Sequence, residues 1–140
     1  MSEPPQPSNS RLTTHNSQLT SGIDLIEIER IAATVDRFGE RFLNRVYTER
    51  ELLYCRGRVE RLAGRFAVKE AVSKALGIGI RRIRWRDVEV LPNWEGKPIV
   101  SLHGKARSEA ERRHISGMEV SITHSRGMAA AMAVAFEGRG

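Results

Sequence analysis

The stretch from Leu62 to Leu76, LAGRFAVKEAVSKAL, constrains the fold of this chain more than any other segment. Its apolar residues recur at helical spacing on more than one side, and a helix that is nearly apolar all round must be covered by other structure. We therefore predict a central helix here. Two charged residues, Glu70 and Lys74, continue one of its apolar stripes.

Glu70 and Lys74 have two interpretations. A Glu–Lys pair four residues apart is common on solvated helix faces, where it contributes about 0.3–0.5 kcal/mol. A lone buried carboxylate, in contrast, would be strongly destabilising. Because the rest of the helix is expected to be covered, we expect both residues to lie in a cleft where their charges have a functional role.

Length and composition favour a small protein without a membrane segment. A chain of 140 residues predicts one domain, with no bilayer-spanning run and no hydrophobic signal segment, so we expect a cytoplasmic protein with no membrane partner. Residues 1–19 are rich in Pro, Ser, Asn and Thr, and we expect a disordered tail there and the domain at 20–140. The single Cys55 excludes an internal disulfide and is expected to be buried.

The chain is basic. Lysine and arginine total 23 against 17 acidic residues, for a net charge of +6. This excess favours an acidic or polyanionic partner, and nucleic acid, a phosphorylated cofactor or an acidic protein would each fit. No aromatic pattern resembles a base-stacking platform. A basic nucleic-acid-binding module without catalytic activity remains the alternative function.

The periodicity predicts an α+β fold, in which a small antiparallel sheet packs against the long central helix. Helical spacing recurs over residues 28–35, 38–46, 48–55, 62–76 and 104–114. Alternation of apolar and polar residues predicts strands at 19–26, 88–90, 99–102, 118–123 and 128–136. The last strand is rich in alanine, which suggests close approach by another element or by another subunit.

Asp24 stands where the first strand is expected to meet the first helix. The sequence Asp24-Leu25-Ile26-Glu27 has the D-x-x-E form of a capping box, and taken alone it favours a helix cap. The carboxylate could instead point across the end of the sheet into a cleft. Gly22, two residues earlier, would let another group come close to the backbone.

Asp24, Glu70, Lys74 and a histidine expected in a hairpin turn, His124, are the candidates for chemistry. Mg²⁺ often uses one or two carboxylates, keeps waters and takes its other ligands from substrate phosphates. A phosphate-rich substrate would also explain the arginine clusters and Lys97 in a Gly-Lys-Pro turn. The residues therefore suggest Mg²⁺-assisted chemistry on a phosphorylated small molecule, although a turn histidine is more often a surface group.

Four segments together resemble the holo-acyl-carrier-protein synthases, the small phosphopantetheinyl transferases. They are GIDLIEIERI at 22–31, GRFAVKEAVSKALG at 64–77, Gly-Lys-Pro at 96–98 and VSITHSRGMAAAMAVA at 120–135. The resemblance implies a phosphopantetheinyl transferase fold and a homotrimer with active sites between subunits. It also implies Mg²⁺-dependent transfer of the 4′-phosphopantetheine arm of coenzyme A, the co-substrate, to a serine of apo acyl carrier protein. That reaction releases adenosine 3′,5′-bisphosphate and supports fatty acid biosynthesis.

The resemblance also implies roles for individual residues. Asp24 and Glu70 match the pair that binds Mg²⁺, Lys74 matches a lysine that assists transfer, and Lys69 is given a supporting role. Arg30 matches a basic position that meets the acidic carrier protein. The residues that match the coenzyme A site are Arg65, Lys74, Gly96, Lys97, Pro98, His124 and Ser125. The acceptor of the serine proton stays open between Glu70 and a metal-bound water.

Overall fold

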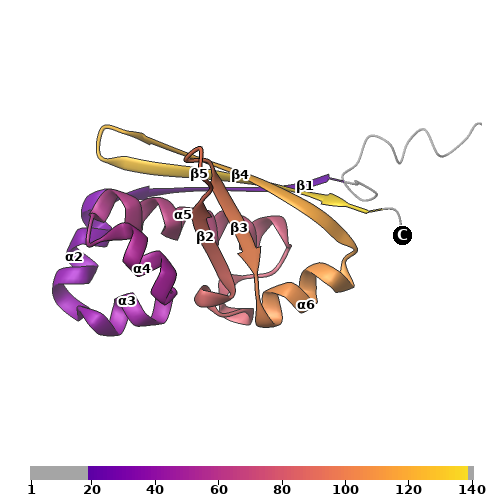
Figure 1. Ribbon diagram of the computed structural model, residues 1–140, viewed down its shortest axis with the longest axis horizontal. Coiled ribbons are helices and arrows are strands. Elements are labelled where there is room, and N and C mark those ends of the chain that lie inside the picture. The colour runs from indigo at the N-terminus through magenta and orange to yellow at the C-terminus, as the bar shows by residue number, and fades with distance from the viewer. Residues whose placement is uncertain (1–18, 139–140) are drawn as a thin grey trace, which may run out of the picture.

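The computed structural model describes residues 19–138 and builds them in layers around one long helix (Figure 1). The helices are α2 (Ile28–Phe38), α3 (Glu40–Val46), α4 (Glu49–Cys55), α5 (Val59–Ala75) and α6 (Gly104–Arg112), with short 3-10 turns η1 (Ile80–Arg82) and η2 (Trp85–Asp87). The strands are β1 (Leu19–Glu27), β2 (Val88–Pro92), β3 (Pro98–Leu102), β4 (Ile115–Ser125) and β5 (Met128–Glu137). The predicted α+β class is confirmed. The expected tail at 1–19 lies outside the described residues except for Leu19, which begins β1.

The helix α5 is the centre of the fold, as its sequence predicts. Most of its residues are buried, and it begins three residues earlier than the predicted start at Leu62. One side of α5 is covered by a three-stranded antiparallel sheet in the order β1–β5–β4, and β2 of the β2–β3 hairpin also packs against α5. Figure 1 shows α2, α3 and α4 at one end of the molecule and α6 at the other.

Small residues let the sheet approach α5 closely. A Cβ atom at Gly22 would lie 2.0 Å from the carbonyl oxygen of Ala71, so β1 could not reach this position with any larger residue. On β5, the alternate alanines turn toward the helix and are buried: Ala129, Ala131, Ala133 and Ala135. The close approach that the alanine-rich strand suggested is therefore an approach to α5 within the same chain.

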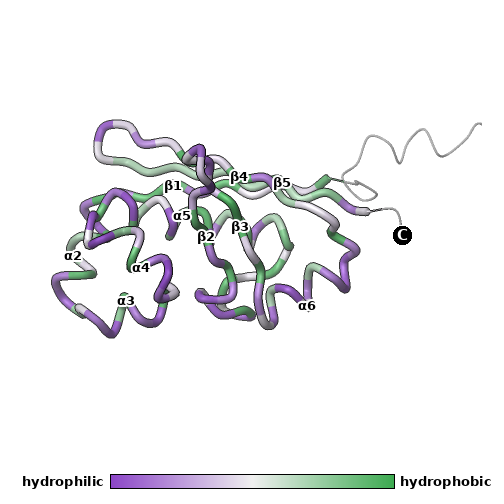
Figure 2. The backbone as a smooth tube through the Cα atoms, in the orientation of Figure 1, coloured by the Kyte–Doolittle hydropathy of each residue, from purple (hydrophilic) through white to green (hydrophobic). Residues whose placement is uncertain are grey.

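On the opposite face of this sheet, β1 and β5 carry exposed apolar side chains. The exposed fractions are 66% for Ile23, 62% for Leu25, 57% for Leu19 and 47% for Met132. In contrast, hydrophilic residues predominate along α3 and α6 (Figure 2). Among the described residues, no helix is long and apolar enough to cross a membrane.

Two predictions about local structure are wrong. Asp24 does not cap the first helix, because antiparallel pairing with β5 continues β1 through Glu27, which is the N-cap residue of α2. His124 and Ser125 do not lie in the hairpin turn, because they pair with Ala129 and Met128 as the last residues of β4. The turn contains only Arg126 and Gly127, both with positive φ, as tight hairpin turns require.

Side-chain hydrogen bonds define the start of α4 and the β2–β3 turn. Thr48 and Glu51 form a capping box at the start of α4: the Thr48 hydroxyl accepts from the Glu51 N–H at 3.2 Å, and Glu51 Oε1 accepts from the Thr48 N–H at 2.8 Å. Cys55 is fully buried. The expected hairpin between β2 and β3 is present, and Asn93 Oδ1 accepts two backbone N–H groups of its turn.

Candidate active site

A pocket of about 370 Å³ brings two carboxylates together from distant parts of the sequence. Asp24 enters it from β1 and Glu70 from α5, while Arg30 on α2 adds a positive charge. Its remaining lining residues are Leu25, Ile26, Ile31, Thr34, Phe42 and Phe66. Three elements that meet at one end of the sheet thus form a small pocket with two carboxylates, one cation and an apolar wall.

Partial burial raises the pKa of both carboxyl groups. For Asp24 the cause is loss of water, and the nearby Lys74 opposes it. The pKa of Glu70 is raised first by burial and then by the negative charge of Asp24, with Lys74 again acting in the opposite direction. The two carboxylates therefore repel each other in a partly dry pocket, and a bound cation would relieve that repulsion.

This donor set suits Mg²⁺. Among residues 19–138, no cluster of three or more His, Cys, Asp and Glu side chains is arranged to hold a metal ion. Asp24 and Glu70 alone can supply two ligands, which matches an ion that keeps its waters and binds substrate phosphates. The residues present therefore fit Mg²⁺ that is shared between protein and substrate.

Lys74 does not line this pocket, but it lies beside Asp24 and lines a separate pocket with Ser21, Gly22, Ile23 and Met132. Its Nζ donates to the carbonyl oxygen of Ile23 at 3.0 Å and lies 3.5 Å from Asp24 Oδ1. The side chain is 53% exposed, so its ammonium group is open to an anionic ligand. The helical spacing that placed Lys74 one turn after Glu70 has thus brought it beside the carboxylate from β1.

The other candidate residues do not line this pocket. His124 Nε2 lies 3.1 Å from the carbonyl oxygen of Glu60, and His124 and Ser125 line a separate pocket of about 720 Å³. Gly96–Pro98 belong to the β2–β3 turn and strand, where Lys97 Nζ contacts Glu119 Oε1 at 2.7 Å. Arg65 is buried, with its guanidinium carbon 4.5 Å from the centre of the Tyr54 ring.

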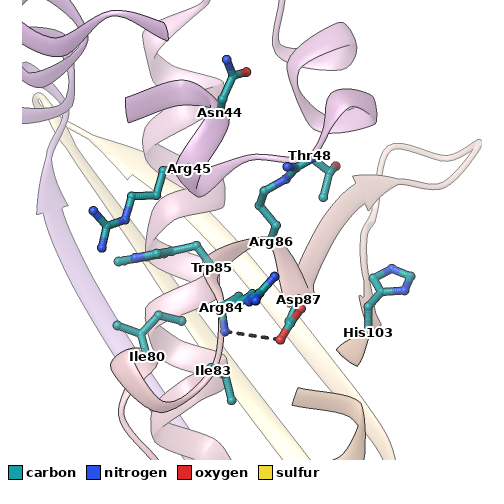
Figure 3. Close-up of a pocket in the computed structure, with 10 residues that line it drawn as sticks. All are labelled: Asn44, Arg45, Thr48, Ile80, Ile83, Arg84, Trp85, Arg86, Asp87 and His103. Atoms are coloured by element: carbon teal, nitrogen blue, oxygen red, sulfur yellow. Dashed lines mark hydrogen bonds between the residues drawn. The ribbon is translucent and has the colours of Figure 1, made fainter. Parts of the chain in front are cut away.

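A further pocket of about 690 Å³ lies on the other side of an aromatic contact (Figure 3). Trp85 lines it, and the Trp85 ring stacks on Phe66 at 4.6 Å between ring centres. Phe66 in turn lines the Asp24–Glu70 pocket. The rings of Phe66 and Trp85 thus form a wall between the carboxylate site and a basic surface that carries Arg45, Arg84 and Arg86.

Comparison with known proteins decides the family. Residues 21–133 match the family model of the 4′-phosphopantetheinyl transferase superfamily. The chain belongs to this superfamily. The resemblance seen in the sequence motifs is confirmed, and the match covers the three-stranded sheet and α5 almost completely.

Individual relatives agree with this membership. The holo-[acyl-carrier-protein] synthase of Herpetosiphon aurantiacus is 45% identical over 123 residues, which cover 83% of this chain and 97% of that protein. The structure of the Helicobacter pylori holo-[acyl-carrier-protein] synthase in complex with coenzyme A is similar with a TM-score of 0.76 and 33% identity, over 82% of this chain and 98% of that one. The Neisseria meningitidis enzyme gives a TM-score of 0.77 at 34% identity, over 84% and 98% of the two chains.

Sequence reasoning about this phosphopantetheinyl transferase missed a buried ion pair beside the site. Lys69 and Glu51 have fully buried side chains, and Lys69 Nζ lies 2.9 Å from Glu51 Oε1. One signal was available: at 100° per residue, Lys69 shares a stripe of α5 with Leu62 and Leu76, so it had to be buried with them. Its partner on α4 had no signal beyond the capping box.

Proposed function

We propose that this transferase moves the 4′-phosphopantetheine arm of coenzyme A to a serine hydroxyl of an apo acyl carrier protein. The relatives are named holo-[acyl-carrier-protein] synthases, and the Helicobacter pylori structure was solved with coenzyme A. The observation that carries the proposal is the placement of Asp24 and Glu70 in one pocket, with the ammonium group of Lys74 3.5 Å from Asp24 Oδ1. Such a site suits a diphosphate that is held by a divalent cation and a lysine.

The proposed reaction is a displacement at phosphorus. The serine oxygen forms a bond to the phosphorus that carries the pantetheine arm, and the bond from this phosphorus to the bridging oxygen breaks. Adenosine 3′,5′-bisphosphate leaves with the electron pair, and the serine proton passes to an acceptor. Catalysis of this kind depends mainly on positioning and on neutralising charge.

The residues of the pocket would divide this work. Lys74 places a positive charge next to Asp24, where the leaving bisphosphate gains negative charge. Glu70, whose pKa is raised, is suited to accept the serine proton, either directly or through a water. Asp24 and Glu70 would together hold Mg²⁺, which when bound neutralises the diphosphate and polarises the reacting phosphorus.

An acidic carrier protein suits the charge of this chain. Arg30 is exposed on α2 and lines the mouth of the pocket. The net charge of +6 would attract an acidic partner over a distance and raise the association rate at low salt. Family membership favours this transferase function over the alternative of a basic nucleic-acid-binding module. The cytoplasm and fatty acid biosynthesis remain our expected setting.

We propose that the active enzyme is a homotrimer with shared sites. The exposed apolar face of the sheet, with Ile23, Leu25 and Met132, is a surface that association would cover. In addition, His124, Ser125 and residues 96–98 do not line the Asp24–Glu70 pocket of their own chain. A neighbouring copy could supply these residues to the site. Arg65 could join them if its guanidinium group leaves the Tyr54 ring and turns toward the ligand.

The test is a transfer assay with a mass readout. The protein is incubated with coenzyme A, Mg²⁺ and an apo acyl carrier protein, and the carrier is weighed for the added phosphopantetheine arm. We expect the adduct on the acceptor serine, dependence on Mg²⁺, and formation of adenosine 3′,5′-bisphosphate in equal amount. An unmodified carrier after prolonged incubation with folded protein would contradict the proposal.

A further inference from the structure

A buried ammonium group ties three elements together next to the proposed site. Besides its contact with Glu51 on α4, Lys69 Nζ donates to the carbonyl oxygen of Trp85 at 3.1 Å and to that of Val88. Glu51 in turn accepts the backbone N–H of Val90 through Oε2 at 2.7 Å. One ion pair thus fixes α4, α5 and the start of β2 relative to each other.

The segment held by Lys69 includes the outer ring of the aromatic wall. Trp85 belongs to the short turn η2, and its carbonyl oxygen accepts the backbone N–H of Val88. Lys69 Nζ donates to the same oxygen, and the Trp85 ring stacks on Phe66, which lines the Asp24–Glu70 pocket. Figure 3 shows the Trp85 ring among the residues that line the neighbouring pocket.

We propose that Lys69, through its pair with Glu51, is a positioning residue that holds Trp85 against Phe66 and so sets the wall of the carboxylate pocket. The inference rests on the proposed function, because that pocket is where coenzyme A would bind. Lys69 itself does not touch the substrate. It follows Phe66 by three residues on α5 but points into the protein, whereas its neighbour Glu70 lines the pocket.

The chemistry of the pair supports a positioning role over a contribution to stability. A buried ion pair often adds nothing to stability compared with apolar residues of similar size, whereas removing one partner leaves an uncompensated charge. This pair instead fixes the relative positions of its partners. An ammonium group has three donors, and three acceptors surround Lys69. Burial lowers the pKa of Lys69 and Glu51 opposes that shift, which is the balance expected of a paired buried lysine.

The position of Trp85 can be measured directly. The chain has two tryptophans, and Trp94 is 90% exposed, so a Trp94→Phe background leaves Trp85 as the sole tryptophan reporter. In that background we expect Lys69→Met to shift Trp85 emission to longer wavelength and to raise its quenching by acrylamide. Lys105→Met, which removes an exposed lysine on α6, is the matched control and should change neither quantity.

The kinetic test uses a double-mutant cycle with Trp85→Leu. We expect Lys69→Met to raise the KM for coenzyme A roughly tenfold, with kcat little changed, because a wall contacts the arm equally in the ground and transition states. In the Trp85→Leu background, Lys69→Met should raise KM no further, since its effect passes through Trp85. A purely structural lysine would instead lower the melting temperature and leave KM unchanged.

Each outcome decides the inference. If Lys69→Met does not fold, the Glu51→Gln/Lys69→Met variant replaces it, because it leaves no isolated buried carboxylate. A folded variant with wild-type Trp85 emission, an unchanged KM, or additive KM effects in the two backgrounds would overturn the proposal. Failure of the proposed function would look different, since wild-type protein would then have no transfer activity while the Trp85 signal still reported on Lys69.

Discussion

Lys69 and Glu70 are neighbours in sequence and have opposite surroundings. Lys69 is fully buried and has partners for its three donors, whereas Glu70 lines a pocket next to a second carboxylate. The 100° turn between successive residues of a helix is the reason. One residue of α5 therefore lies inside the protein behind the aromatic wall, and the next places a carboxylate in the pocket.

The placement of Glu70 predicts that it trades stability for function. Replacing it by Gln keeps the shape and removes the charge, so we expect transfer activity to fall by at least about a hundredfold. In metal-free protein at neutral pH, the same variant should melt about 1–3 °C higher, because a charge that the pocket disfavours is gone. Transfer assays and thermal unfolding with a chelator present would measure both effects.

The pH dependence of that difference follows from the raised pKa of Glu70. The stabilisation contributed by such a carboxyl group is fully present when the pH is below 4.5, its pKa in the unfolded chain. It is lost as the pH rises through the higher pKa of the folded protein. The gain from Glu70→Gln should therefore appear at neutral pH and vanish below about pH 4.5. Glu111→Gln, on the exposed side of α6, is the control. A lower melting temperature for Glu70→Gln at neutral pH would contradict the prediction.

At the scale of the elements, the strong periodic patterns were predictable from the sequence and the junctions were not. The all-round apolar pattern of α5 identified a covered helix, and alternation identified both hairpins. The D-x-x-E motif at Asp24 was misleading because a strand and a helix meet there, and only pairing with β5 decides that β1 extends to Glu27. His124 was assigned to a turn because the sequence around Arg126 and Gly127 does not show whether the turn has two residues or more.

The contact between β1 and α5 predicts an intolerant position. Gly22→Ala would place a methyl group 2.0 Å from the carbonyl oxygen of Ala71, which is backbone and can move only with the whole of α5. We expect the free energy of unfolding to fall by about 3 kcal/mol or more, the upper end for overpacked sites. Denaturant unfolding measures this loss.

The neighbouring residue supplies the control for that experiment. Ser21 is exposed on the other face of β1, so Ser21→Ala should change the free energy of unfolding by no more than about 0.5 kcal/mol. Asp24 lies on the same strand as Gly22. Any Gly22→Ala protein that still folds should therefore also lose transfer activity. Wild-type stability of Gly22→Ala would mean that β1 does not lie against α5 as described.

At the scale of the whole molecule, the candidate residues divide into two groups. Asp24 and Glu70 share one pocket, and Arg30, which the resemblance assigned to contact with the carrier protein, lines it as well. His124 and Ser125 line a second pocket on the same chain, and sequence spacing alone carries no information on such a separation. In the homotrimer that we propose, each of these pockets would be one half of a site, and the exposed apolar residues of β1 and β5 would join the halves from different copies.

Shared sites predict that two inactive variants restore each other. Asp24→Asn would disable one half-site and His124→Ala the other, so each homogeneous protein should have little transfer activity. When the two are unfolded, mixed in equal amounts and refolded together, about a quarter of the sites in random oligomers would join two intact halves. We therefore expect up to about a quarter of wild-type activity in the mixture. Each variant refolded alone is the control.

The same experiment tests the surface that joins the copies. Ile23→Glu places a charge on the exposed apolar face of β1, away from the carboxylate pocket, and should yield monomers in analytical ultracentrifugation. If sites are shared, those monomers lose transfer activity although Asp24 and Glu70 are intact, and Ile23→Glu in both partners abolishes complementation. An active monomer, or a refolded mixture no more active than its components, would show that each chain completes its own site.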